Sequence, residues 1–486
     1  MNGYLNRCFD YVYHPTVAVR RFQCAALLPR ETSAVLKWVL EEEFHMEKSP
    51  GSGFTVPQLR VSKVRPAALL MHWLAVASLL LAPAVSQSWI RWLAVGALLV
   101  QGLGNLGIRT LFRRNMAALP RLDTPPDNGG LAPRPGVTFI IPARDEEECI
   151  EQAARSMLMQ DYERVEFIAI NDGSSDNTPG ILDTLAREFP KLRVIHDPPV
   201  APGWRGKANA IWTGAQHANP DHEWLFLTDA DAVFEPDVLH AAVAIASRNK
   251  LDLLTGIVYL QNGSIWEELV MPAKWSGIVV SANPARLNDP ASAPVGVGPF
   301  MLVRRSAYLD SGGHAAFPGR EPEDTLLAAV IKAWGGKVGV AVVDRKVRVR
   351  IYNGYHAMRD AFVRKARIVA GDNSLVLQMR TAYTLLQEVL PMPVAVFAAV
   401  TLASSGWNAS WAAILLAGAW AYGTYSIAAK EFRRVARMRR GLEWCHPVAG
   451  CIRARFMIEA WWQCLRRSPM HWRGRPVSVD ANTPEP

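Results

Sequence analysis

Two aspartates separated by one residue, Asp229 and Asp231, follow the apolar run Trp224–Thr228. Such a short apolar run predicts a buried strand, and the chain bends where the strand ends. Two carboxylates at that bend can face one hard cation, which takes oxygen ligands and commonly bridges to substrate phosphates. Most aspartate pairs of this spacing belong to solvated turns, so the position at a strand end is what favours a metal site.

Further polar residues occupy comparable positions. Asp172 follows a second predicted strand, where it could accept from a nucleobase or a ribose or form only an Asx-turn. Arg144 and Lys207 could donate charge-assisted hydrogen bonds to phosphate, although each alone would more often be a surface cation. Glu323 and Asp324 begin a predicted helix, where capping and the helix dipole favour carboxylates. As a functional pair they offer a base for a hydroxyl group.

The chain around these residues alternates between short apolar runs and helical patterns. Strands are predicted over 137–141, 165–170, 193–196 and 223–227, and helices over 146–159, 179–188, 207–218 and 325–334. This alternation predicts an α/β fold with a mostly parallel sheet. Ligands of such sheets bind beyond the carboxyl ends of the strands, where these polar groups fall.

The composition restricts the class of protein. The 486 residues are 50% hydrophobic and 20% charged, with a formal net charge of +9. This excludes a disordered, collagen-like or disulfide-scaffold protein. The six cysteines form no C-x-x-C pair, which indicates reduced thiols, with Cys445, His446 and Cys451 as a minor alternative metal site.

Four apolar segments flank the α/β block, at 67–85, 92–108, 384–404 and 411–428. Their lengths suit a bilayer crossing, and short polar links favour two transmembrane hairpins, 66–110 and 382–429, over buried core helices. Glu388 lies in the third segment, which indicates a functional or end-of-span position.

Basic residues predict the orientation of these hairpins. The links contain a single charge, Arg91, whereas the opposite ends are rich in lysine and arginine. The positive-inside rule therefore places both termini and the block 124–370 in the cytoplasm, for a multi-pass protein of the inner (plasma) membrane. In the tail 430–486, arginine alternates with apolar and aromatic residues, which favours an interfacial amphipathic helix on anionic membrane lipid over nucleic acid.

The N-terminal segment 1–65 carries no chemistry that the sequence identifies. It lacks the apolar core of a signal peptide, and one helix is predicted over 31–47. Met46 and Met71 leave open a start further downstream.

Seven short motifs follow one another along the chain. They are Pro142-Ala-Arg-Asp-Glu-Glu147, Asn171-Asp-Gly-Ser-Ser-Asp-Asn-Thr178, Pro202-Gly-Trp-Arg-Gly-Lys207, Thr228-Asp-Ala-Asp231, Gly296-Val-Gly298, Gly312-Gly-His314 and Glu323-Asp324. Their order is similar to that of family 2 glycosyltransferases. The chain most resembles the membrane-bound branch that includes carotenoid- and hopanoid-associated and ceramide-type glucosyltransferases, and Trp472-Arg-Gly-Arg475 is similar to a closing element of that branch. The Q-x-x-R-W element of processive polysaccharide synthases is missing, and Arg364-Lys-Ala-Arg367 lies in its region.

The resemblance implies an inverting transferase with a cytoplasmic GT-A domain of Rossmann-like, mostly parallel sheet, flanked by transmembrane helices. Asn171 and Glu323 depart from residues common in the family, but both keep an oxygen ligand. The resemblance also implies the roles of individual residues: Pro142, Arg144, Glu146 and Asp172 for the nucleoside, Lys207 near the donor, Asp229 and Asp231 for the sugar-nucleotide and Mg²⁺ or Mn²⁺, and Asp324 as general base.

The predicted function is transfer of a single sugar from a nucleotide-sugar, expected to be a UDP-sugar, to a lipid hydroxyl. The alternatives are a short polysaccharide synthase and a catalytically silent, membrane-anchored nucleotide-binding scaffold. Intact Asp229, Asp231 and Asp324 disfavour the scaffold. No nucleic-acid partner is expected, and the sequence indicates no oligomeric state.

Overall fold

The computed structural model describes residues 41–48, 55–63, 88–122, 134–289, 292–472 and 475–477. The predicted span 67–85 lies outside these residues. The helix predicted over 31–47 is wrong in its described part, because β1 (Glu41–Lys48) pairs antiparallel with β2 (Thr55–Lys63). The sequence pattern shows only the local helix propensity, which is weak here, and pairing with a partner strand outweighs it.

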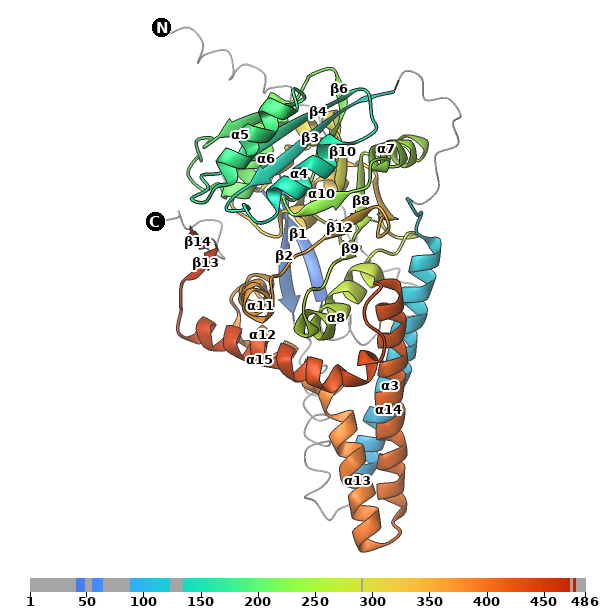
Figure 1. The fold of residues 1–486 in the computed structure, drawn as a ribbon. Helices are drawn as coiled ribbons and strands as arrows, with labels where there is room; N and C mark the ends of the chain where they lie inside the picture. The colour runs from blue at the N-terminus through green and yellow to red at the C-terminus, as the bar shows by residue number, and fades with distance from the viewer. Residues whose placement is uncertain are drawn as a thin grey trace.

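A seven-stranded sheet forms the centre of the α/β block, in the order β11–β8–β10–β6–β3–β4–β5 (Figure 1). Its strands pair parallel except at β10, which runs antiparallel to β6 and β8, so the predicted mostly parallel sheet is confirmed. The strands are β3 (Gly136–Ala143), β4 (Val165–Asn171), β5 (Leu192–His196), β6 (His222–Leu227), β8 (Leu253–Ile257), β10 (Met301–Arg304) and β11 (Val338–Val342).

Helices cover both faces of this sheet. On β3, Phe139 and Ile141 join one core with α4, α5 and α7, whereas Ile140 joins a second core with α6, α9 and α10. Successive strand residues point to opposite faces, so a strand covered on both sides is a continuous apolar run. The helices are α4 (Ile150–Leu158), α5 (Thr178–Glu188), α6 (Gly206–His217), α7 (Val238–Arg248), α9 (Arg305–Asp310) and α10 (Glu323–Trp334).

A small second sheet, in the order β7–β12–β9, was not predicted. It is built from β7 (Ala232–Phe234), β9 (Tyr259–Leu260) and β12 (Val347–Val349). Strands of two or three residues leave no periodic pattern in a sequence. β7 begins directly after Asp231, so this sheet holds the chain that leaves the predicted metal site.

Among the described residues, two helices are long and apolar enough to cross a membrane, α3 (Ser88–Ala118) and α14 (Ala409–Val435). They lie side by side (Figure 1). The segment predicted as the span 384–404 is broken instead: α12 (Ser374–Thr384) continues through a π-helical turn (Leu385–Val389), and α13 (Pro391–Ser405) is bent by 50° from it. A proline has no backbone N–H, so Pro391 and Pro393 favour this break.

Apolar side chains are exposed along these helices, and tryptophans gather at one end. Trp89 and Trp92 begin α3, and Trp407 precedes α14. These ends meet, because Arg91 Nη1 donates to Ser410 Oγ at 3.2 Å. Aromatic residues at one end and arginines at the other match the predicted orientation, which stays a prediction.

The tail contains α15 (His446–Leu465), which runs between the sheet domain and the apolar helices (Figure 1). It contacts α8 (Ile265–Ser281), α11 (Tyr355–Val369) and α12. Its exposed residues recur every three or four positions and so share one face, as an interfacial helix requires. They are Val448, Cys451, Arg455, Ile458, Trp462 and Leu465. Short elements complete the chain, namely the 3-10 turns Gly313–Ala316 and Leu442–Cys445 and the strands β13 (Met470–Trp472) and β14 (Arg475–Val477).

Candidate active site

Asp229 and Asp231 lie in the turn between β6 and β7, at the carboxyl edge of the sheet. Thr228 Oγ1 donates to Pro299 O at 2.9 Å and so fixes the end of β6. Oδ1 of Asp231 is buried and has no hydrogen-bond partner among the described residues. Burial, followed by the charges of Asp229 and Glu146, raises the pKa of Asp231 to about 8. The charge of Lys207 lowers the pKa of Asp231 in turn, but burial and the two carboxylates outweigh it.

Lys207 links this turn to helix α10. Its Nζ lies 2.7 Å from Asp229 Oδ1 and 2.5 Å from Glu323 Oε1. Burial alone would lower the pKa of Lys207, but Asp229 and Glu323 raise it well above its usual value. Burial likewise raises the pKa of Glu323, and Lys207 outweighs that effect and lowers it to about 2. Three ionised groups from α6, β6 and α10 thus hold one another in place.

Asp324 occupies the first turn of α10. Its Oδ1 accepts from Thr325 N at 2.7 Å, and its Oδ2 accepts from Gly298 N at 3.1 Å. Burial, followed by the charge of Glu323, raises the pKa of Asp324. The alternative that this carboxylate only begins a helix accounts for the Thr325 contact but not for the contact with Gly298, 26 residues away in the sequence.

Gly296 and Gly298 let the chain pass between the two groups of carboxylates. A Cβ on Gly298 would lie 3.2 Å from Asp229 Oδ2, and one on Gly296 would lie 2.1 Å from Asp324 O. A contact of 2.1 Å with a backbone atom is a steric clash, so position 296 requires glycine. The absence of side chains here brings Asp229 and Asp324 to the same place.

The predicted nucleoside residues gather in the loops after β3 and β4. Arg144 Nη1 donates to Asp172 O at 2.7 Å, and Asp172 N donates to Ala143 O at 2.9 Å. Pro142 lies opposite Ile170 in the parallel ladder. The structure therefore brings Pro142, Arg144 and Asp172 together.

Glu146 connects these loops to the aspartate turn. Its backbone N–H donates to Thr178 Oγ1 at 2.8 Å, and α4 begins at Ile150 rather than at the predicted residue 146. The charge of Glu146 contributes to the raised pKa of Asp231, so the predicted nucleoside loop and the predicted metal site interact electrostatically.

Asn171, where the family often has an acidic residue, has a local role. Its Oδ1 accepts from Ser174 N at 3.1 Å, and its Nδ2 donates to Asp197 Oδ1 at 3.2 Å. A local side-chain contact with the turn, which was considered for Asp172, is thus made by Asn171 to the backbone three residues on.

Two residues near the site were not selected as site residues from the sequence. His314 is buried, its Nδ1 lies 2.8 Å from Tyr308 Oη, and burial lowers its pKa to about 3. Lys365 on α11 is close enough to Asp324 to lower the pKa of that carboxyl slightly against burial. The available signals were the Gly312-Gly-His314 motif and the basic run Arg364-Lys-Ala-Arg367.

The donor set suits a metal that completes its coordination with substrate oxygens. In the described part of the chain, no three His, Cys, Asp or Glu side chains are arranged to hold a metal ion. The minor alternative of a metal site at Cys445, His446 and Cys451 is therefore not supported. Asp229 and Asp231 supply two carboxylates, and the unpartnered Oδ1 of Asp231 fits a cation. Mg²⁺ is usually bound in this way, through one or two carboxylates and substrate phosphates.

Comparisons with known proteins agree with the fold. The sequence model of the family described as Glycosyl transferase family 2 matches residues 138–311. The poly-beta-1,6-N-acetyl-D-glucosamine synthase of Staphylococcus epidermidis is 29% identical over 182 residues, 36% of this chain and 41% of that protein. The beta-monoglucosyldiacylglycerol synthase of Synechocystis is 32% identical over 161 residues, 32% of this chain and 30% of that protein.

This chain thus spans less than half the length of these curated relatives. Among solved structures, a mannosyltransferase from Pyrobaculum calidifontis in complex with GDP-Man and Mn²⁺ has a TM-score of 0.45 and 20% identity, covering 82% of this chain and 99% of that one. Residues 138–311 match the glycosyl transferase family 2 model, and the sheet domain that contains them has the Rossmann-like, mostly parallel arrangement of the GT-A fold.

Proposed function

We propose that the protein is an inverting transferase that moves one sugar from a nucleotide-sugar, expected to be a UDP-sugar, to a lipid hydroxyl at the cytoplasmic face of the plasma membrane. The observation that carries the proposal is the meeting of Asp324 with the Asp229–Lys207–Glu323 chain at the sheet edge of a family 2 domain. We assign it to the membrane-bound branch that glycosylates lipids.

Asp324 acts as the general base. It removes the acceptor proton as the hydroxyl oxygen attacks the anomeric carbon from the side opposite the diphosphate. Its raised pKa suits proton uptake, and the N–H groups of Gly298 and Thr325 orient the carboxylate. General-base assistance of this kind contributes typically about 10²–10⁴-fold in rate.

The aspartate turn receives the diphosphate end of the donor. Asp229 and Asp231 would hold Mg²⁺ or Mn²⁺, which when bound neutralises charge on the departing diphosphate. Lys207 keeps Asp229 in position through its ion pair. We assign the nucleoside to the adjoining loops, which carry Pro142, Arg144, Glu146 and Asp172.

The lipid acceptor is supported by the path from the base to α15. Helix α11 carries Lys365, whose charge acts on the pKa of Asp324, and Arg359 Nε of the same helix donates to Glu459 Oε2 of α15 at 2.9 Å. The exposed face of α15 carries an apolar stripe that includes Trp462. If this face of α15 lies on the lipid surface, only helix α11 separates α15 from the base Asp324, and a lipid hydroxyl can reach that base. The Synechocystis relative is named for glucosylation of a diacylglycerol.

A short polysaccharide synthase is the second candidate. It is favoured by the Staphylococcus epidermidis relative, which is named as a polymer synthase. Both candidates use the same base and donor site, so product analysis distinguishes them.

The test uses membranes that contain the full chain and a radiolabelled nucleotide-sugar. We expect label in the lipid extract, and Asp324→Asn should reduce it about 10²–10⁴-fold. Asp310→Asn, an exposed aspartate of α9, is the matched control and should leave transfer unchanged. Undiminished transfer by Asp324→Asn would contradict the base assignment. Polymer in the aqueous phase without glycolipid would replace the lipid proposal with the synthase.

A further inference from the structure

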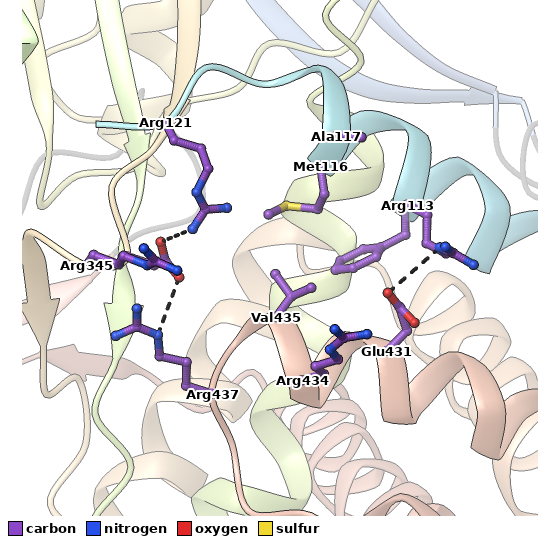
Figure 2. A pocket seen from close by; sticks show the side chains of 11 residues that line it. Arg113, Met116, Ala117, Arg121, Arg345, Glu431, Arg434, Val435 and Arg437 are labelled. Atoms are coloured by element: carbon purple, nitrogen blue, oxygen red, sulfur yellow. Dashed lines mark hydrogen bonds and ion pairs between the residues drawn. The ribbon is translucent and has the colours of Figure 1, made fainter. Parts of the chain in front are cut away.

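A pocket of about 550 Å³ opens where the ends of α3 and α14 adjoin the sheet domain (Figure 2). Its lining comes from three places that are far apart in the sequence: the last turns of α3, the link between β11 and β12, and the end of α14. Five arginines line it, namely Arg113, Arg121, Arg345, Arg434 and Arg437.

The pocket carries surplus positive charge, because its lining includes only two carboxylates. Asp344 lies 3.0 Å from Arg121 and 3.8 Å from Arg437, and Glu431 lies 3.9 Å from Arg113. Figure 2 shows these ion pairs on opposite sides of the opening, with Arg434 between them. Arg434 is exposed and forms no ion pair with a described residue. Two carboxylates thus hold arginines in place without neutralising the pocket, which fits an anionic ligand.

The wall between the two ion-paired groups is apolar. Phe112, Met116 and Val435 line it, and Figure 2 shows Met116 and Val435 between the arginines. Phe112 and Val435 lie at the ends of the two helices that are apolar enough to cross a membrane. A ligand that suits both features has a phosphate attached to apolar chains.

We propose that this pocket binds the phosphate headgroup of an anionic membrane lipid, with the acyl chains along α3 and α14. Basic pockets at the cytoplasmic ends of membrane helices bind such headgroups. The site is separate from the sheet edge that holds Asp231. Binding there fastens the β11–β12 link, which carries Asp344, to the apolar helices.

The test measures lipid retention by the full chain in detergent, using native mass spectrometry with phosphatidylglycerol and phosphatidylcholine. The wild type should retain phosphatidylglycerol in preference. The double variant Arg434→Gln/Arg437→Gln should bind it about 25-fold more weakly, roughly 5-fold per arginine. Arg439→Gln/Arg440→Gln removes the same charge from exposed residues outside the pocket lining and should retain the lipid.

Inorganic phosphate and glycerol 3-phosphate serve as competitors. If either binds as tightly as phosphatidylglycerol, the ligand is a soluble phosphate compound and the lipid proposal is overturned. Equal loss in both double variants, or no loss in the pocket variant, also overturns it. Retained sugar transfer shows that a variant is folded. If the double variant does not fold, Arg434→Gln alone carries the same comparison, because this side chain has no carboxylate partner to leave unpaired.

Discussion

The sheet edge carries an excess of negative charge, whereas the ends of the apolar helices α3 and α14 carry an excess of positive charge. At the sheet edge, Lys207 lies among more carboxylates than it can pair, and Asp231 keeps a buried oxygen without a partner. The lining of the pocket between α3 and α14 contains five arginines and two carboxylates, Asp344 and Glu431. An unbalanced cluster is costly unless a ligand of the missing sign completes it.

Balanced pairs elsewhere in the molecule make the contrast clearer. Arg433 Nη2 lies 2.8 Å from Glu268 Oε2 and joins α14 to α8, and Arg359 joins α11 to Glu459 of α15. Each cation there has its own carboxylate. We therefore interpret balanced pairs as packing contacts and unbalanced clusters as ligand sites, an acidic one for a cation with its donor and a basic one for a lipid phosphate.

The largest expected effect comes from removing charge at the sheet edge. Asp231→Asn should lower sugar transfer on the order of 10³-fold, because a metal ion supplies several kcal/mol of charge stabilisation. Transfer rates and electron paramagnetic resonance of added Mn²⁺ should both report the loss, since the variant would bind Mn²⁺ more weakly. Unchanged Mn²⁺ binding in Asp231→Asn would contradict the interpretation of the acidic cluster as a cation site.

Substitutions of Lys207 test whether the ion pairs at the sheet edge also stabilise the folded protein. Lys207→Met leaves Asp229 and Glu323 unpaired, so the free energy of unfolding should fall by about 2–3 kcal/mol. Lys207→Arg keeps the charge and should recover most of that loss. Thermal unfolding in detergent measures both variants. Equal stability of the Met and Arg variants would show that the ion pairs with Asp229 and Glu323 contribute little.

The strands of the sheet could be predicted because burial on both faces leaves a local pattern, a short run of apolar residues. The segment 137–141 is buried on both faces, so four of its five residues are apolar, and β3 confirms the prediction. The carboxyl-edge position of Asp229 followed from the strand before it. The antiparallel β10 and the short strands around β12 depend on partners distant in the chain, and no local pattern reports them.

The contacts within the site could not be predicted, for the same reason. Lys207 and Glu323 are 116 positions apart, and the hydrogen bond from Gly298 to Asp324 exists only in the folded chain. The break in the span 384–404 was signalled by Pro391, but hydropathy alone made that segment look continuous.

A pH dependence is expected from His314, a buried neutral group beside the acidic site. Burial lowers its pKa from 6.5 to about 3, so the unfolded chain binds a proton between these values and the folded protein does not. The free energy of unfolding should therefore fall as pH drops below about 6.5, by up to about 1.4 kcal/mol per pH unit. His314→Gln should flatten this part of the profile measured by thermal unfolding, whereas His217→Gln, at an exposed position, should not. A profile equally steep in both variants would assign the dependence to other groups.

The smallest effect is expected on α15, where the exposed face is mostly apolar. Trp462 is 49% exposed, and the described helices α3 and α14 are already long and apolar enough to anchor the protein in a membrane without it. Losing one aromatic contact with lipid should therefore change only how α15 presents the acceptor. Trp462→Ser should raise the KM for a bilayer-embedded lipid acceptor about 5-fold, which corresponds to roughly 1 kcal/mol, and leave the KM of the donor unchanged. Trp334→Ser, 47% exposed at the end of α10, is the matched control. If both variants change the acceptor KM equally, α15 does not lie on the lipid surface, and the acceptor must reach Asp324 by another face of the domain.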